Sequence, residues 1–131
     1  MEMRVSFQGN KKVAADFAGF KVLTDQPKDD GGDETAPSPF QLFLASLGTC
    51  AGFFVLSFCQ KRNISTEGIE LVQTAQWDPE KHLVSKILLE IRVPSGFPEK
   101  YKASLISAAN LCAVKRHLHE PPRFEIVTRP S

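Results

Sequence analysis

The sequence predicts an α+β domain in which helices pack on antiparallel sheets. Strand-like segments flank a long apolar segment over residues 38–62, which we read as a helix. Two strand candidates follow it, then a second segment with a helical pattern, and then a final strand candidate. The predicted order is therefore strands, a buried helix, two strands, an amphipathic helix and a strand. At 131 residues we expect a single domain, residues 1–131, with one core.

The first 24 residues predict an N-terminal hairpin or a three-stranded meander. Residues 2–8 alternate, Gly9 and Asn10 supply a turn, and the apolar positions of residues 11–24 are broken at Gly19. The segment that follows, QPKDDGGDETAPSP from Gln26, is rich in proline, glycine and aspartate and is typical of a loop.

A helix-start signal ends this loop. Ser38 is the predicted N-cap, Pro39 takes the first helical position, and Gln41 is placed to exchange hydrogen bonds with Ser38. We expect the helix to run to about Arg62, with Asn63 in a left-handed cap. The helix is apolar on all sides, so a small domain cannot bury it alone, and we predict a homodimer.

Residues 68–77 and 82–93 read as two strands joined by a hairpin loop at 78–81. Alternate positions of the second strand are apolar, which predicts that one sheet face is covered; these positions are Ile87, Leu89, Ile91 and Val93. An amphipathic helix follows from residue 99, with helical pattern continuing to about Leu118. The segment RFEIVTR, residues 123–129, predicts a final strand.

Composition excludes some classes of function. Hydrophobic residues make up 42% and charged residues 24% of the chain, and the net charge of +1 offers no global attraction for nucleic acid or anionic lipid. The first residues lack the pattern of a secretory signal, and polar residues interrupt the apolar segment, so we expect a cytoplasmic protein that is not a membrane protein. Three cysteines in a reducing compartment do not form a structural disulfide framework.

The cysteines are the candidate reactive groups. Cys50 and Cys59 would lie on one helix about 180° apart around its axis and roughly 13 Å apart along it, too far for a disulfide. Cys112, at the end of the second helical segment, is the one that packing could bring to Cys50. Lys115 and Arg116 lie on the side of Cys112 and would favour a thiolate. On spacing alone, all three cysteines are equally consistent with buried packing residues, and we keep that interpretation for Cys59.

The residues GGDETAPSPFQLFLASLGTC, followed by LCAVKRHL, resemble the OsmC/Ohr family of osmotically induced and organic-hydroperoxide-resistance proteins. The specific features are the Ser-Pro helix start with Cys50 eleven residues after Pro39, and the Cys-x-Val-basic segment at Cys112. The loop GGDETAPSP is closest to the broader OsmC-like branch.

This resemblance implies an OsmC-like fold with antiparallel sheets around two helices per chain, in an intertwined homodimer with the long helices at its interface. It also implies a thiol-dependent peroxidase in which Cys50 attacks an organic hydroperoxide and Cys112 resolves the sulfenic acid as a disulfide. A dithiol, such as a lipoylated protein, would restore the pair. We expect no cofactor and no metal. Candidate pocket residues are Phe40, Phe43, Phe53 and Phe54.

The chain differs from the well-studied peroxidases at two places. Phe40 takes the position of a glutamate that orients an arginine in those enzymes, and no arginine lies between Arg4 and Arg62. Candidate cations to stabilise the thiolate are Lys11, Lys12, Lys21 and Arg116, with Asp33 or Glu34 to orient a lysine. The alternative function is a binding protein on the same scaffold for a small hydrophobic or thiol ligand. A metal site at Cys112, His117 and His119 is a third hypothesis, although this spacing matches no closed zinc pattern.

Overall fold

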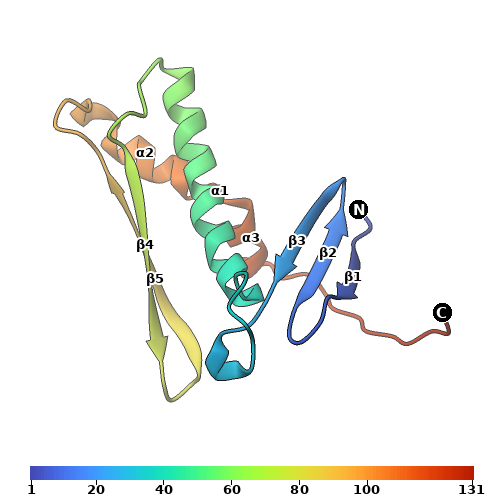
Figure 1. Ribbon diagram of the computed structural model, residues 1–131. Coiled ribbons are helices and arrows are strands. Elements are labelled where there is room, and N and C mark those ends of the chain that lie inside the picture. Colours follow the sequence, from blue (N-terminus) through green and yellow to red (C-terminus); the bar gives the residue numbers. More distant parts are fainter. The chain divides into compact units, whose positions relative to one another are not determined.

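The computed structural model describes all 131 residues and is an α+β structure with two antiparallel sheets and three α-helices (Figure 1). The chain groups into two compact units, residues Met1–Ala45 and Ser46–Ser131. Helix α1, Pro39–Lys61, begins in the first unit and continues in the second. The fold class predicted from the sequence is therefore confirmed.

The first unit contains the predicted three-stranded meander. Strands β1 (Arg4–Phe7), β2 (Val13–Phe17) and β3 (Phe20–Thr24) form an antiparallel sheet in the order β1-β2-β3. Ala18 and Gly19, which join β2 to β3, both have positive φ values, 49° and 81°. Two successive left-handed residues match the right-handed twist of the strands they join, which explains the glycine at this turn.

The loop after β3 is organised around the carboxylate of Asp25, whose side chain is 0% exposed. It accepts hydrogen bonds from the Thr35 hydroxyl at 2.7 Å, the Thr35 backbone N–H at 3.0 Å and the Gln26 N–H at 2.8 Å. The hydrogen bond from the Thr35 hydroxyl is the largest of the effects that hold the pKa of Asp25 well below its ordinary value. A buried carboxylate with this many donors fixes the two ends of the loop together.

The same loop closes tightly at Gly32. A Cβ atom at this position would lie 1.9 Å from the backbone oxygen of Gln26. The loop includes a short 3-10 turn, η1, Lys28–Asp30. Only glycine permits this close approach of backbone to backbone.

Both ends of helix α1 follow their sequence signals. The Ser38 N–H donates to Gln41 Oε1 at 2.9 Å, and the Gln41 N–H donates to Ser38 Oγ at 3.2 Å, which is the predicted reciprocal cap. At the other end Asn63 has a φ of 52°, as expected for a left-handed cap.

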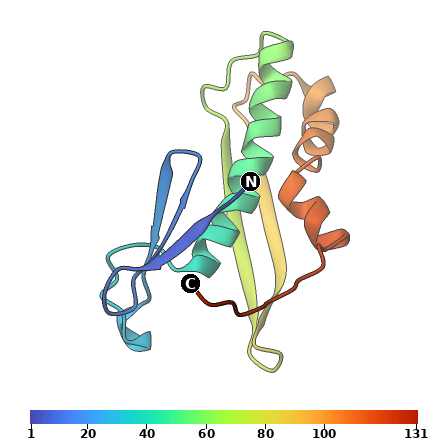
Figure 2. The same cartoon turned by 90° about the vertical axis from the view of Figure 1, so that its right-hand side faces the viewer.

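The second unit contains the predicted hairpin. Strands β4 (Glu70–Asp78) and β5 (Leu83–Arg92) pair antiparallel, with a register shift between Gln76 and Trp77. The apolar face predicted for this strand is covered in part: Ile91 and, just after the strand, Val93 pack against the core, whereas Ile87 is 37% exposed. Figure 2 shows the other helices of this unit following one another beside α1.

The core of the second unit joins α1, the hairpin and the second helical segment; its buried residues are Val55, Phe58, Cys59, Phe97, Leu105 and Ala108. Cys59 is 0% exposed, and burial raises the pKa of its thiol. The guanidinium of Arg62 lies 3.7 Å from the centre of the Phe58 ring. Cys59 is therefore a packing residue, as predicted.

The second helical segment extends as far as predicted, but it is divided into two helices rather than continuous. A 3-10 turn η2 (Glu99–Tyr101) leads into α2 (Lys102–Ala109), and a separate helix α3 spans Ala113–His119. Cys112 lies between them with φ −50° and ψ 119°, outside the helical region, and its Sγ accepts a hydrogen bond from the Lys115 N–H at 3.4 Å. The chain breaks here because a side chain caps a new helix.

The final strand predicted over residues 123–129 is also wrong for the single chain, since residues 120–131 form neither helix nor strand. Phe124 is 84% exposed and Ile126 is 95% exposed. The segment has the alternating pattern of a strand, but a strand forms only where a neighbouring strand supplies backbone partners. No strand of this chain is paired with it.

Helix α1 is long and apolar enough to cross a membrane by length and composition alone, a test that the core helix of a soluble protein also passes. Only 22% of its most apolar 18-residue stretch is buried within the chain. The remaining apolar surface includes Phe53 and Leu56.

Candidate functional site

The structure brings the thiols of Cys50 and Cys112 together. Cys50 lies on α1, and Cys112 lies at the break between α2 and α3, where its thiol is within hydrogen-bonding reach of the Cys50 sulfur. The sequence predicts Cys112 as the cysteine that packing could bring to Cys50. None of the three cysteines forms a disulfide, and Cys59 lies in the core of the same unit.

The surroundings of Cys50 favour its thiolate. Desolvation of the sulfur acts to raise its pKa, but hydrogen bonds from the backbone of Val114, the side chain of Cys112 and the backbone of Ala113 lower it. The positive charge of Arg116 adds to this lowering. The net result is a pKa of Cys50 below its ordinary value, so that more of the nucleophilic form is present near neutral pH.

The first turn of α3 supplies most of these groups. Because the chain leaves the helical region at Cys112 and starts α3 at Ala113, the backbone N–H groups of this turn have no partner one turn earlier. The Cys50 sulfur takes the place of such a partner. Arg116 lies one turn further along α3, so a single short helix supplies both the donors and the charge.

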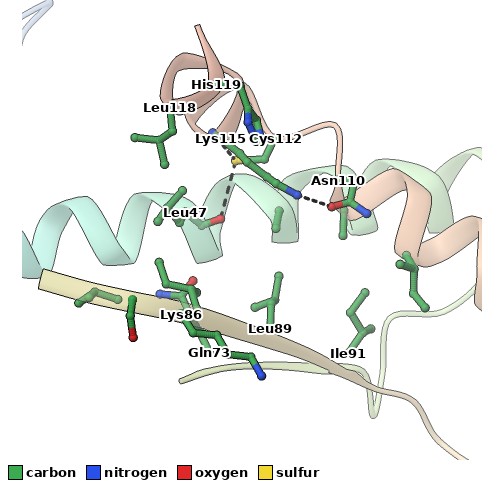
Figure 3. A pocket seen from close by; sticks show the side chains of 16 residues that line it. Leu47, Gln73, Lys86, Leu89, Ile91, Asn110, Cys112, Lys115, Leu118 and His119 are labelled. Carbon is green, nitrogen blue, oxygen red and sulfur yellow. Dashed lines mark hydrogen bonds between the residues drawn. The ribbon is translucent and has the colours of Figure 1, made fainter. Parts of the chain in front are cut away.

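Cys112 is more enclosed than Cys50. Its side chain is 3% exposed, whereas Cys50 is half-buried. Its Sγ also lies 4.0 Å from the backbone oxygen of Leu47, and Figure 3 shows this contact beside the hydrogen bond that the Lys115 N–H donates to the same sulfur. These contacts fix the sulfur between α1 and α3.

A groove of about 770 Å³ opens beside Cys112 in the second unit. Its walls come from α1, from β4 and β5, and from α2 and α3 (Figure 3). Most of the lining is apolar, and the polar members are Gln73, Ser85, Lys86, Asn110, Lys115 and His119. A cavity of this size and character is typical of a small-molecule site.

The four phenylalanines predicted to line a pocket are placed differently. Neither Phe53 nor Phe54 lines the groove, and their rings contact each other edge to face with centroids 5.3 Å apart. In the first unit Phe40 and Phe43 stack on each other, with centroids 5.7 Å apart. The apolar lining comes instead from aliphatic residues such as Leu89 and Ile91.

Among the candidate cations, Arg116 lies in the same unit as Cys50, and its positive charge lowers the pKa of that thiol. Lys12 makes an ion pair with Asp33, which raises the pKa of Lys12, and Lys21 lies 3.8 Å from Asp16. Lys11 reaches Gly31 with its side chain. The three lysines therefore have neighbours within the first unit.

Sequence reasoning missed the backbone of Ala113 and Val114 and the carbonyl of Leu47 as parts of the site. Every residue has the same backbone groups, so the sequence does not indicate which of them take part in a site. The N–H groups of Ala113 and Val114 are available only because the helix is interrupted at Cys112. Cys112, His117 and His119, the residues of the metal hypothesis, do not form a ligand set, because no cluster of three or more potential metal ligands is present. The His117 ring lies 2.6 Å from the backbone oxygen of Ala113.

The family model described as OsmC-like protein matches residues 31–127, and the chain belongs to this family. A search of curated proteins found no significant match.

Solved structures with the same fold agree with that assignment. An osmotic stress induced and detoxification response protein of Psychrobacter arcticus has a TM-score of 0.74 at 22% identity, covering 87% of this chain and 85% of that one. An organic hydroperoxide resistance protein of Legionella pneumophila, also titled a redox protein, has a TM-score of 0.55 at 18% identity over 90% and 89% of the two chains. An organic hydroperoxide resistance protein of Vibrio cholerae, with captopril bound in one of its active sites, has a TM-score of 0.57 at 15% identity over 92% and 86%.

Proposed function

We propose that this protein is a thiol-dependent peroxidase that reduces organic hydroperoxides in oxidative stress defence, with Cys50 and Cys112 as its redox pair. The observation that carries the proposal is the Cys50 thiol, with a lowered pKa, in contact with a second thiol. Membership in the OsmC-like family and the hydroperoxide-resistance names of two structural relatives support the choice of substrate class.

The chemistry balances with these two residues and a hydroperoxide. The Cys50 thiolate attacks the terminal oxygen of ROOH, the O–O bond breaks, and the alkoxide leaves as ROH after taking a proton, which leaves Cys50 as a sulfenic acid. The Cys112 sulfur then attacks the Cys50 sulfur, and water leaves as the disulfide forms. A dithiol such as a lipoylated protein restores both thiols by exchange and becomes a disulfide itself.

Arg116 provides the positive charge in this proposal. Phe40 stands where the best-studied relatives have a glutamate, so the chain lacks the acid that would orient an arginine from its N-terminal region. In this chain α3 carries the cation, within reach of the Cys50 sulfur. An arginine also has donors that can polarise a peroxide oxygen.

The working unit in this proposal is a homodimer in the cytoplasm. The exposed apolar side chains of α1 would be stabilised by burial against another surface, and the exposed strand-like segment 123–129 would be stabilised by pairing with another strand. A second copy of the chain supplies both. Light scattering coupled to gel filtration tests this, with twice the 14.5 kDa of one chain as the expected mass; a monomer at micromolar concentration would contradict it.

The test of the function is a steady-state assay with tert-butyl hydroperoxide and dihydrolipoamide. We expect the wild type to consume peroxide, Cys50→Ser to fall to the uncatalysed rate, and Cys112→Ser to stall as a sulfenic acid after one turnover. Cys59→Ala is the matched control, because its thiol lies in the core, and it should keep the wild-type rate per folded molecule. Equal rates for the wild type and Cys50→Ser would remove Cys50 from the chemistry.

A second candidate function is binding without turnover, and the groove favours it. A largely apolar cavity of about 770 Å³ fits a small hydrophobic or thiol ligand. The structure of the Vibrio cholerae relative contains captopril in one of its active sites. Native mass spectrometry showing a retained ligand, together with no peroxide consumption under any dithiol, would favour binding over catalysis.

A further inference from the structure

The groove reaches the cysteine pair from one side only. Cys112 is one of its lining residues, and Cys50 is not, although Cys50 is the more exposed of the two. Figure 3 shows Cys112 on the wall formed by α3, above Leu47. A molecule held in the groove would therefore meet the sulfur of Cys112 and not that of Cys50.

The groove combines an apolar interior with positive charge. Leu89 and Ile91 of β5 form part of the interior, and Ile106 of α2 lines it from the opposite side. Two lysines stand on facing walls, Lys86 on β5 and Lys115 on α3 (Figure 3).

The charges at the groove are of one sign. None of the sixteen lining residues is acidic, and the Lys115 Nζ contacts a neutral partner, the Asn110 Oδ1 at 2.6 Å. The groove therefore complements an aliphatic chain that carries a negative group at one end.

We infer that this groove binds the reductant, an aliphatic dithiol with an anionic end, and that the reductant attacks the Cys50–Cys112 disulfide at Cys112. This inference rests on the proposed function, because it requires that disulfide. The anionic end is held by Lys86 and Lys115.

The exchange is balanced as follows. One thiolate of the reductant bonds to Cys112 Sγ, the disulfide bond breaks, and Cys50 leaves as a thiolate. The second thiol of the reductant then attacks the reductant's own sulfur, which releases Cys112 as a thiolate and leaves the reductant as a cyclic disulfide. Both protons of the reductant end on the two cysteines. Departure of Cys50 is favoured, because its surroundings lower its pKa and stabilise the thiolate that leaves.

The site of attack is tested on the full chain oxidised with diamide, which does not depend on reaction with a peroxide. The oxidised protein is treated with 8-mercaptooctanoate, a monothiol with an aliphatic chain and a carboxylate, while iodoacetamide traps the thiolate that is released. Peptide mapping should find the mercaptooctanoate on Cys112 and the carbamidomethyl group on Cys50. Cys59, in the core, serves as an unmodified reference.

The outcomes separate this inference from the proposed function. Mercaptooctanoate on Cys50 with alkylation of Cys112 would overturn the inference and leave the peroxidase cycle intact. Failure of diamide to form the Cys50–Cys112 disulfide would overturn both. Mapping to Cys112 together with no peroxidase activity would support the inference and contradict the peroxide step.

The anionic end is tested with two matched dithiols, dihydrolipoate and its neutral amide, on diamide-oxidised protein. We expect the rate constant for reduction to favour dihydrolipoate by about fivefold, a ratio typical of one exposed charge interaction. The double variant Lys86→Gln, Lys115→Gln should bring that ratio to about one, whereas Lys81→Gln, on the hairpin loop, should not change it. Equal rates for the two dithiols with wild-type protein, or an unchanged ratio in the double variant, would overturn the charge selectivity.

Discussion

The sulfur of Cys50 lies within hydrogen-bonding reach of the thiol of Cys112, although one belongs to the long helix α1 and the other to a break late in the chain. The break is what creates this relationship. An uninterrupted helix through residues 110–112 would use its own N–H groups internally and would leave none for Cys50. The irregular backbone at Cys112 thus serves the thiol chemistry that we propose.

The charge of Arg116 predicts a change in the reactivity of Cys50. Replacing Arg116 with glutamine removes one of the effects that lower the pKa of Cys50, so that pKa should rise and the thiolate fraction at pH 7 should fall. The rate of alkylation by iodoacetamide, measured against pH, should shift to higher pH. Arg123→Gln, in the exposed terminal segment, is the control and should leave the profile unchanged. An unshifted profile in Arg116→Gln would show that its charge does not act on the thiolate.

The capping role of Cys112 predicts that alanine and serine at this position differ. Cys112→Ala removes the acceptor for the Lys115 N–H and should destabilise the protein by about 1 kcal/mol or more, whereas serine keeps an acceptor and should cost less. Urea unfolding measures the difference. Hydrogen exchange of the Lys115 amide gives a local readout and should be faster in the alanine variant alone. Equal stability of the two variants would argue against the cap.

The close approach at Gly32 predicts a strong effect of a single methyl group. Gly32→Ala would place Cβ against the backbone oxygen of Gln26, where no side chain can move aside, so we expect a loss of about 2 kcal/mol or more. Gly96→Ala is the matched control, since nothing lies within 4 Å of its added Cβ, and it should be close to neutral. A thermal unfolding midpoint for Gly32→Ala equal to that of Gly96→Ala would contradict the loop geometry.

The buried carboxylate of Asp25 predicts how stability depends on pH. Its pKa is lower in the folded protein than the ordinary value of 3.8, so the folded state binds fewer protons than the unfolded state at acid pH. Its contribution to stability is complete above pH 3.8 and is lost as the pH falls from there toward the folded pKa.

A variant isolates this contribution. Asp25→Asn should be less stable than wild type at pH 7, and the difference should shrink as the pH falls below 3.8, because the unfolded wild-type chain then gains a proton at Asp25 that the folded chain does not bind. Urea unfolding at a series of pH values measures it. Asp29→Asn, in the exposed turn η1, is the control and should behave as wild type. A constant difference at all pH values would exclude the ionised carboxylate as its cause.

Elements with a local signal were predicted well. The reciprocal cap of Ser38 and Gln41 depends on residues three positions apart, and the hairpin of β4 and β5 depends on alternation within each strand and a short loop between them. Both signals lie within a few residues, so composition and spacing suffice to predict them.

Other features depend on partners distant in the chain. The sequence by itself determined the fold class, the ends of α1, the hairpin, the packing role of Cys59 and the choice of Cys112 as the cysteine able to meet Cys50. Only the tertiary structure decided that the helical pattern breaks at Cys112, that Asp25 is buried against Thr35, and that the strand-like segment 123–129 is unpaired in one chain. The reason is physical. Capping, burial of a charge and strand pairing all need hydrogen-bonding partners from other segments of the chain, and the local sequence does not indicate which segments provide them.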